Sequence, residues 1–159
     1  MAVKITQAIK DLFDDPKSRK ILATVDREGN PHAVFKDSLN VTEEGYLTYW
    51  ELIETSRANK NMVYSIWFHK PVTVSITDGT TSYQIKGIPY RSIIAGKEFE
   101  KEYRKVQELY GNVDLSAVWL IEPMEIVEET LEKRRTEEEE KHPILKHLDR
   151  LVVSENAQK

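Results

Sequence analysis

The segment "ETSRANKN", residues 54–61, places two hydroxyl side chains and an arginine side by side, at Thr55, Ser56 and Arg57. It follows the aromatic-rich run "GYLTYW", so it lies where a strand is expected to give way to a helix. The first turn of a helix carries unpaired backbone N–H groups and the positive end of the helix dipole. These side chains therefore either cap an ordinary helix or form a phosphate-binding site.

Other catalytic chemistries have little support in the sequence. The histidines, at 32, 69, 142 and 147, include no pair spaced i, i+3 or i, i+4, so no metal site is predicted. The chain has no cysteine, which excludes disulfides, thiolate zinc sites and cysteine nucleophiles. A Gly-x-Ser-x-Gly elbow, a Walker loop and a Gly-x-Gly-x-x-Gly turn are also absent from the sequence. We assign no catalytic residue, and segment 54–61 remains the best phosphate candidate.

Composition restricts the class of protein. With 159 residues, of which 40% are hydrophobic and 31% charged, the chain is expected to fold as one domain with a core. A net charge of −4 argues against nonspecific nucleic-acid binding, which depends on a basic surface. The apolar runs fall far below the roughly 20 residues that span a bilayer. The N-terminal segment reads as an amphipathic helix rather than a signal peptide, so we expect a cytoplasmic protein.

The elements that would position the polar segment are mainly strands. Hydrophobic alternation predicts six strands and helical spacing predicts helices at 1–13, 55–68 and 95–110. Gly87, in the middle of a strand, indicates a bulge or a close approach of two backbones. Six strands with helices in two of the connections favour a closed or half-open antiparallel barrel. The strands are expected at 21–25, 32–41, 46–50, 71–77, 82–92 and 115–129.

The C-terminal part differs in character from the rest. We expect residues 1–127 to form the barrel domain and residues 128–159 to form a charged helical extension. The run "EETLEKRRTEEEEK" has almost no apolar face, which predicts a solvated helix. An apolar stripe follows, and we expect it to dock on the body or on a partner chain; it comprises Ile144, Leu145, Leu148 and Leu151.

The order of these segments resembles the FMN-binding split-barrel family related to pyridoxamine 5′-phosphate oxidase. The resemblance covers roughly residues 5–127 and depends on several short motifs in sequence. A turn "EGNP" closes the first hairpin, and a hydroxyl, a basic residue and an asparagine follow at Ser56, Arg57 and Asn61. Pro71 then opens a strand, and Gly87 interrupts a later one. The resemblance implies a six-stranded, mostly β, split barrel with flanking helices that forms a homodimer.

The resemblance also implies an FMN site at each subunit interface. Arg57, Ser56 and Thr55 would hold the 5′-phosphate, and Lys36 would point toward the phosphate or the ribityl chain. The local sequence alone leaves an alternative open, in which Thr55 merely caps the helix and Arg57 is solvated. The polar triplet "KDS", which contains Lys36, is explained equally well by an edge or a bulge of the strand as by a ligand contact.

Three further residues would approach the flavin ring on this resemblance. Trp50 and Glu51 would lie nearest the isoalloxazine, and Thr81 would reach it from the other subunit. The alternatives are that Trp50 belongs to the core or the dimer interface and that residues 80–82 form a plain turn. Trp119, within "AVWLI", is expected in the core.

The function that follows is a flavoprotein, an oxidoreductase in which FMN carries the electrons to or from a small molecule or a redox protein. Residues 124–140 lack the Trp-containing segment and the Arg-x-His pair that hold the substrate of the true oxidases, which argues against vitamin B6 oxidation. Three alternatives stay open. The barrel would instead bind a deazaflavin, bind haem through His32 or His69, or serve as a cofactor-free binding or regulatory module.

Overall fold

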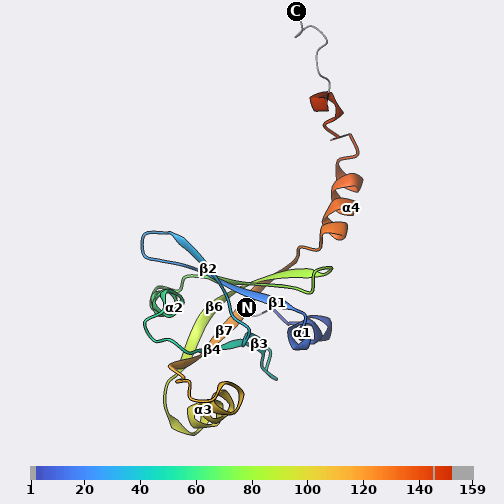
Figure 1. Ribbon diagram of the computed structural model, residues 1–159. Coiled ribbons are helices and arrows are strands. Elements are labelled where there is room, and N and C mark those ends of the chain that lie inside the picture. Colours follow the sequence, from blue (N-terminus) through green and yellow to red (C-terminus); the bar gives the residue numbers. More distant parts are fainter. Residues whose placement is uncertain (1–2, 145, 152–159) are drawn as a thin grey trace, which may run out of the picture.

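Seven antiparallel strands form one curled sheet, a half-barrel, in the order β2-β1-β5-β6-β7-β4-β3 (Figure 1). The computed structural model describes residues 3–144 and 146–151. Every pairing along the sheet is antiparallel, as expected for a split barrel built from hairpins. The strands are β1 Arg19–Val25, β2 Pro31–Phe35, β3 Asn40–Val41, β4 Leu47–Glu51, β5 Val72–Thr77, β6 Ser82–Ile93 and β7 Ala117–Glu128.

The expectation of six strands was wrong by one, because the segment 32–41 does not continue as a single strand. It breaks at a turn in which the Leu39 N–H donates to the Lys36 carbonyl at 3.1 Å. Lys20 of β1 holds this turn from the side, since its ammonium group donates to the Leu39 carbonyl at 2.8 Å. The polar triplet within the segment thus marks the end of β2, and β3 follows on the opposite edge of the sheet.

The main core lies inside the curl of the sheet and is closed by α1, Gln7–Asp14. Thr6 caps this helix, so it begins at Gln7 and the expected helical range 1–13 was wrong at its start. Ile9, Leu12 and Phe13 form its buried face, as the helical spacing predicts. Alternate residues of β4 and β5 are buried, which is the period-two pattern of strands with one face in a core.

The two longest strands, β6 and β7, continue beyond this core and support α3, Gly96–Tyr110. Under α3 lies a second cluster that contains Val106, Leu115 and Val118. Gly87 lies at a register shift between β6 and β7, and a Cβ atom there would be 2.6 Å from the Glu122 carbonyl oxygen. The prediction of a bulge or close backbone approach at Gly87 is therefore confirmed.

The chain beyond β7 leaves the sheet. Figure 1 shows α4, Leu131–Lys141, leading away from the body, at the opposite end of the molecule from α3. No residue of α4 is buried. A short 3-10 helix, η1, Leu148–Leu151, follows, and Leu148 and Leu151 of the expected apolar stripe are exposed, as is Ile144. Docking of these three residues on the body of the same chain is not observed, and Leu145 lies outside the described residues. Within the described part, no helix has both the length and the apolar character needed to cross a bilayer.

Candidate functional site

The polar segment singled out in the sequence is the start of α2, Arg57–Phe68. Ser56 is the N-cap, because its backbone is extended and its hydroxyl accepts from the Asn59 N–H at 3.0 Å. A serine hydroxyl that accepts one hydrogen bond still has its own proton to donate. The cap and a phosphate contact are therefore compatible at Ser56. Thr55 precedes the cap and is exposed.

Arg57 lies in the first turn of α2 and is exposed. Among the described residues, no carboxylate lies within ion-pair distance of its guanidinium. It lines a cleft of about 1080 Å³ between α2 and the β1–β2 turn, together with Asp26 and Asn30. Hydrogen bonds from Asn30 and Glu28, with a smaller contribution from the Arg57 charge, hold the pKa of Asp26 below its ordinary value. The guanidinium is thus available to an anionic ligand.

Aromatic side chains follow Arg57 along the same cleft, and the sequence analysis did not assign them to a site. Tyr64, Trp67 and Phe68 line it on the later turns of α2, and Trp67 is 76% exposed. Their spacing of three and four residues would have identified a common face of the helix. One part of the cleft is therefore polar, with cationic and anionic side chains, and the other part is aromatic.

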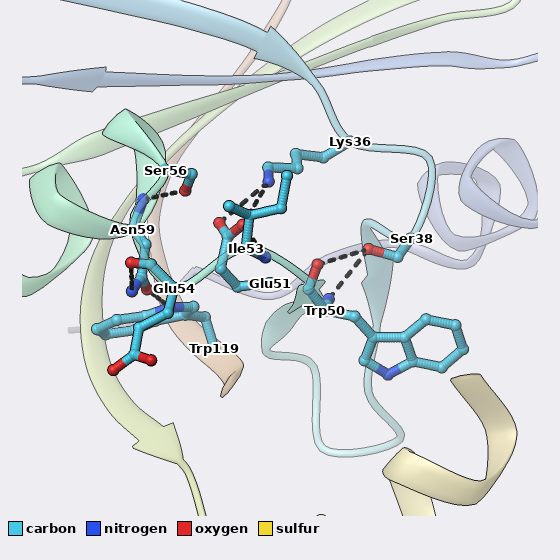
Figure 2. A network of polar contacts seen from close by, with 9 residues as sticks. All are labelled: Lys36, Ser38, Trp50, Glu51, Ile53, Glu54, Ser56, Asn59 and Trp119. Carbon is cyan, nitrogen blue, oxygen red and sulfur yellow. Dashed lines mark hydrogen bonds and ion pairs between the residues drawn. The ribbon is translucent and has the colours of Figure 1, made fainter. Parts of the chain in front are cut away.

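Lys36 and Glu51 contact each other. The Lys36 ammonium lies 3.0 and 3.2 Å from the two carboxylate oxygens of Glu51, and the Glu51 side chain is 1% exposed (Figure 2). Glu51 also accepts a hydrogen bond from the Ile53 N–H at 3.3 Å. These groups lie at the end of β4, beside the loop 52–56 that leads to α2. In this chain the lysine charge is neutralised by the glutamate.

Trp50 projects from the other face of β4 than Glu51, because adjacent residues of a strand point to opposite sides. Figure 2 shows its indole turned away from the Lys36–Glu51 pair. The indole N–H donates to Glu102 of α3 at 2.8 Å, and the Trp50 backbone N–H donates to the Ser38 hydroxyl at 3.0 Å. Lys36, Trp50 and Glu51 nevertheless line one small hollow of about 290 Å³, next to Ile53.

Thr81 lies in a different part of the chain, in the turn between β5 and β6. It lines a hollow beside α1, with Asp11 and Asp78. Its backbone N–H donates to the Asp78 carboxylate at 2.7 Å, and hydrogen bonds of this kind lower the pKa of Asp78. Within one chain, Thr81 and Arg57 therefore belong to separate hollows.

A buried side chain that the sequence analysis did not assign joins the loop 52–56 to the sheet. The Asn59 amide donates to the Glu54 carbonyl at 2.9 Å and accepts from the Trp119 indole N–H at 2.9 Å (Figure 2). Trp119 is buried, as its position in an apolar strand predicts. The Asn59–Trp119 contact spans 60 residues, so no local sequence pattern would have indicated it.

Comparisons at the sequence level give no relative. No protein-family model matches this chain, and no curated protein matches it. Among solved structures, HupZ of Group A Streptococcus is similar with a TM-score of 0.66 and 22% identity, over 80% of this chain and 95% of HupZ. A candidate pyridoxamine 5′-phosphate oxidase of Lactobacillus delbrueckii has a TM-score of 0.60 and 21% identity, over 78% and 93%. An FMN-binding protein of Syntrophomonas wolfei has a TM-score of 0.61 and 12% identity, over 77% and 84%.

Other solved structures of this fold are named for other ligands. They include an F420 reductase, with a TM-score of 0.58, and the haem storage protein HutZ of Vibrio cholerae, with a TM-score of 0.57. The resemblance to proteins of the pyridoxamine 5′-phosphate oxidase type and to FMN-binding proteins is confirmed at the level of the fold. At these identities the likeness extends to the fold alone.

Proposed function

We propose that this protein binds FMN and acts as a flavin-dependent oxidoreductase. The observation that carries the proposal is the exposed Arg57 guanidinium at the N-terminus of α2, beside the cap Ser56, in a fold shared with an FMN-binding protein. A guanidinium makes bidentate hydrogen bonds to a phosphate, and the helix N-terminus adds unpaired N–H groups. Arg57, Ser56 and Thr55 would hold the 5′-phosphate. The donor set therefore fits a dianionic group.

The flavin, when bound, supplies the redox chemistry, and the protein supplies position and polarity. The loop 52–56 borders both hollows of the site, since Glu54 lines the large cleft and Ile53 the small one. Trp50 and Glu51 would face the ring side of the ligand from the small hollow, and Lys36, paired with Glu51, would face the ribityl chain. At about 290 Å³ this hollow is at the lower end of the range for ligand pockets, so one chain alone offers little room for the ring.

A homodimer would complete the site, and we propose that a second copy of this chain supplies the missing wall. Thr81 of that second copy would reach the flavin. The exposed aromatic face of α2 supports association, because single chains seldom leave such side chains clustered in water. The electron partner is then a small molecule or a redox protein.

Haem is less well supported than a flavin by the positions of the histidines. His32 is half-buried on β2 and His69 ends α2, and neither lines the large cleft or the small hollow. A deazaflavin would use the same cationic group as FMN. Absorption spectra of the purified protein, with FMN added if it is colourless, separate the flavins from haem and from a cofactor-free module.

Substitution of the guanidinium tests the proposal. We expect Arg57→Ala to weaken FMN binding by about 2–3 kcal/mol, roughly 30- to 150-fold in Kd, because a charged hydrogen-bonding pair is lost. The Kd for FMN of Arg57→Lys should lie between those of the original protein and Arg57→Ala, since an ammonium group keeps the charge but not the bidentate geometry. Titration of FMN followed by flavin fluorescence measures the Kd. The control is Arg104→Ala, an exposed arginine on α3. An unchanged Kd in Arg57→Ala would show that the phosphate lies elsewhere.

A further inference from the structure

We propose that Asn59 is a positioning residue that fixes the loop 52–56 in the shape required to bind a phosphate. The inference rests on the proposed function. It concerns an uncharged side chain at the inner wall of the large cleft, where Asn59 is 9% exposed.

The orientation of the Asn59 amide follows from its neighbour. An indole N–H can only donate, so the atom of Asn59 that faces Trp119 must be the oxygen Oδ1. The nitrogen Nδ2 is then directed to the Glu54 carbonyl, at 2.9 Å. The two side chains of the indole–amide hydrogen bond are fixed in place, because Trp119 is buried in β7 and Asn59 is only 9% exposed. The loop carbonyl is thereby tied to the sheet through one amide.

The backbone of Asn59 serves the same segment. Its N–H donates to the Ser56 hydroxyl, which forms the helix cap. One residue therefore holds the cap with its backbone and the loop with its side chain. The other end of the loop is held separately, because the Ile53 N–H donates to the buried carboxylate of Glu51. Between these two attachments lies Thr55, exposed and next to Arg57.

A loop of five residues that the buried Glu51 and Asn59 hold at Ile53, Glu54 and Ser56 loses much of its conformational freedom before a ligand arrives. Pre-organisation of this kind lowers the entropic cost of binding. The benefit applies to the part of the ligand that the loop contacts, which is the phosphate. The structure thus predicts that Asn59 contributes to the preference for FMN over riboflavin, which lacks the phosphate, and contributes little to binding of the ring.

The test compares two ligands and two matched variants. We expect Asn59→Ala to raise the Kd for FMN about tenfold and to leave the Kd for riboflavin within about twofold. The control is Thr24→Val, which removes the buried hydrogen bond from Asn61 of α2 to β1 but leaves the loop contacts intact. If Asn59 had a purely structural role, its loss would weaken the binding of both ligands and lower the melting temperature together. We expect this parallel change for the control. Such a parallel loss in Asn59→Ala, or an unchanged FMN Kd, would overturn the inference.

A second readout needs no ligand. Amide hydrogen exchange of the ligand-free protein should become faster at residues 53–57 in Asn59→Ala and remain unchanged there in Thr24→Val. Trp119→Phe, which removes only the indole donor, should give the same pattern more weakly, and it replaces Asn59→Ala if that variant fails to fold. Unchanged slow exchange at residues 53–57 in both Asn59→Ala and Trp119→Phe would overturn the proposal. If Arg57→Ala retains FMN while the loop exchanges faster, the proposed function fails but the positioning of the loop stands.

Discussion

The Tyr49 hydroxyl is fully buried and, among the described residues, has no hydrogen-bond partner. Burial, and next the nearby Glu51 carboxylate, raise the pKa of Tyr49 well above its ordinary value. Lys36 lies over the tyrosine ring, with its ammonium 5.3 Å from the centroid. Three polar groups are thus packed at the end of β4, of which only the lysine and the glutamate satisfy each other. A polar group left in this state costs free energy of folding.

We expect Tyr49→Phe to leave the free energy of unfolding at neutral pH unchanged or to raise it by about 1 kcal/mol, because an unpaired hydroxyl is removed. Since the pKa is raised in the folded state, the unfolded chain loses the phenolic proton first as the pH rises. The part of the free energy of unfolding that depends on protonation of Tyr49 is therefore fully present below about pH 10 and is lost as the pH rises above it. Urea titrations from pH 7 to 11 should show a smaller alkaline loss in Tyr49→Phe. Exposed Tyr110→Phe is the control, and an equal loss in both variants would contradict the prediction.

The residue types near the site could be predicted from the sequence to a useful extent. The guanidinium at the start of α2 follows from the polar segment, and Gly87 follows from its place in a strand. The capping residue is Ser56, one position after the Thr55 considered from the sequence. The ion pair between Lys36 and Glu51 could not be predicted, because Lys36 lies in the turn after β2 and Glu51 ends β4, and the two meet only in the folded sheet. The opposite directions of Trp50 and Glu51 do follow from strand alternation, once both are placed on β4.

At the scale of elements, the contact between β6 and β7 depends on a missing side chain. We expect Gly87→Ala to lower the free energy of unfolding by about 2 kcal/mol, because the added Cβ would be 2.6 Å from the Ile121 side chain and equally close to the Glu122 carbonyl. Urea unfolding measures the loss. Gln84→Ala, on the exposed face of the same strand, should change it little. A similar stability for both variants would mean that the strands separate without cost.

The bounds of α2, α3 and most strands lie within about two residues of the expected positions, because their apolar spacing is local. The helix expected at 1–13 begins only at Gln7, because Thr6 caps it. The division of the segment 32–41 into two strands depends on Lys20, which belongs to another strand and holds the turn at Leu39. The sequence contains the polar triplet that breaks the strand, but not the direction that the chain takes after it.

At the scale of the whole molecule, the proposed dimer depends on the exposed face of α2. Trp67 and Val63 lie one helical turn apart, and Phe68 is beside them, all with large exposed fractions. The extension is a second exposed apolar surface, through Leu148 and Leu151. Changing one surface at a time shows which of them is responsible for association.

We expect Trp67→Glu to shift the protein from dimer to monomer, because a charge would be buried against a second copy. Light scattering after size-exclusion chromatography measures the mass. A chain that ends after Thr130 is the control, and it should remain a dimer with nearly the same melting temperature, since α4 buries no residue. Loss of the dimer in the truncated chain alone would assign association to the extension instead.

The placement of the three tryptophans gives this chain an internal set of optical reporters. Trp119 lies beneath the loop 52–56, Trp50 packs against α3, and Trp67 faces water on α2. Indole emission shifts to the red with exposure to water, so the buried and exposed rings emit at different wavelengths. A quencher such as iodide, which stays in solvent, would reach Trp67 and spare Trp119. Ligand entry, helix displacement and chain association would thus each alter the emission of a different ring.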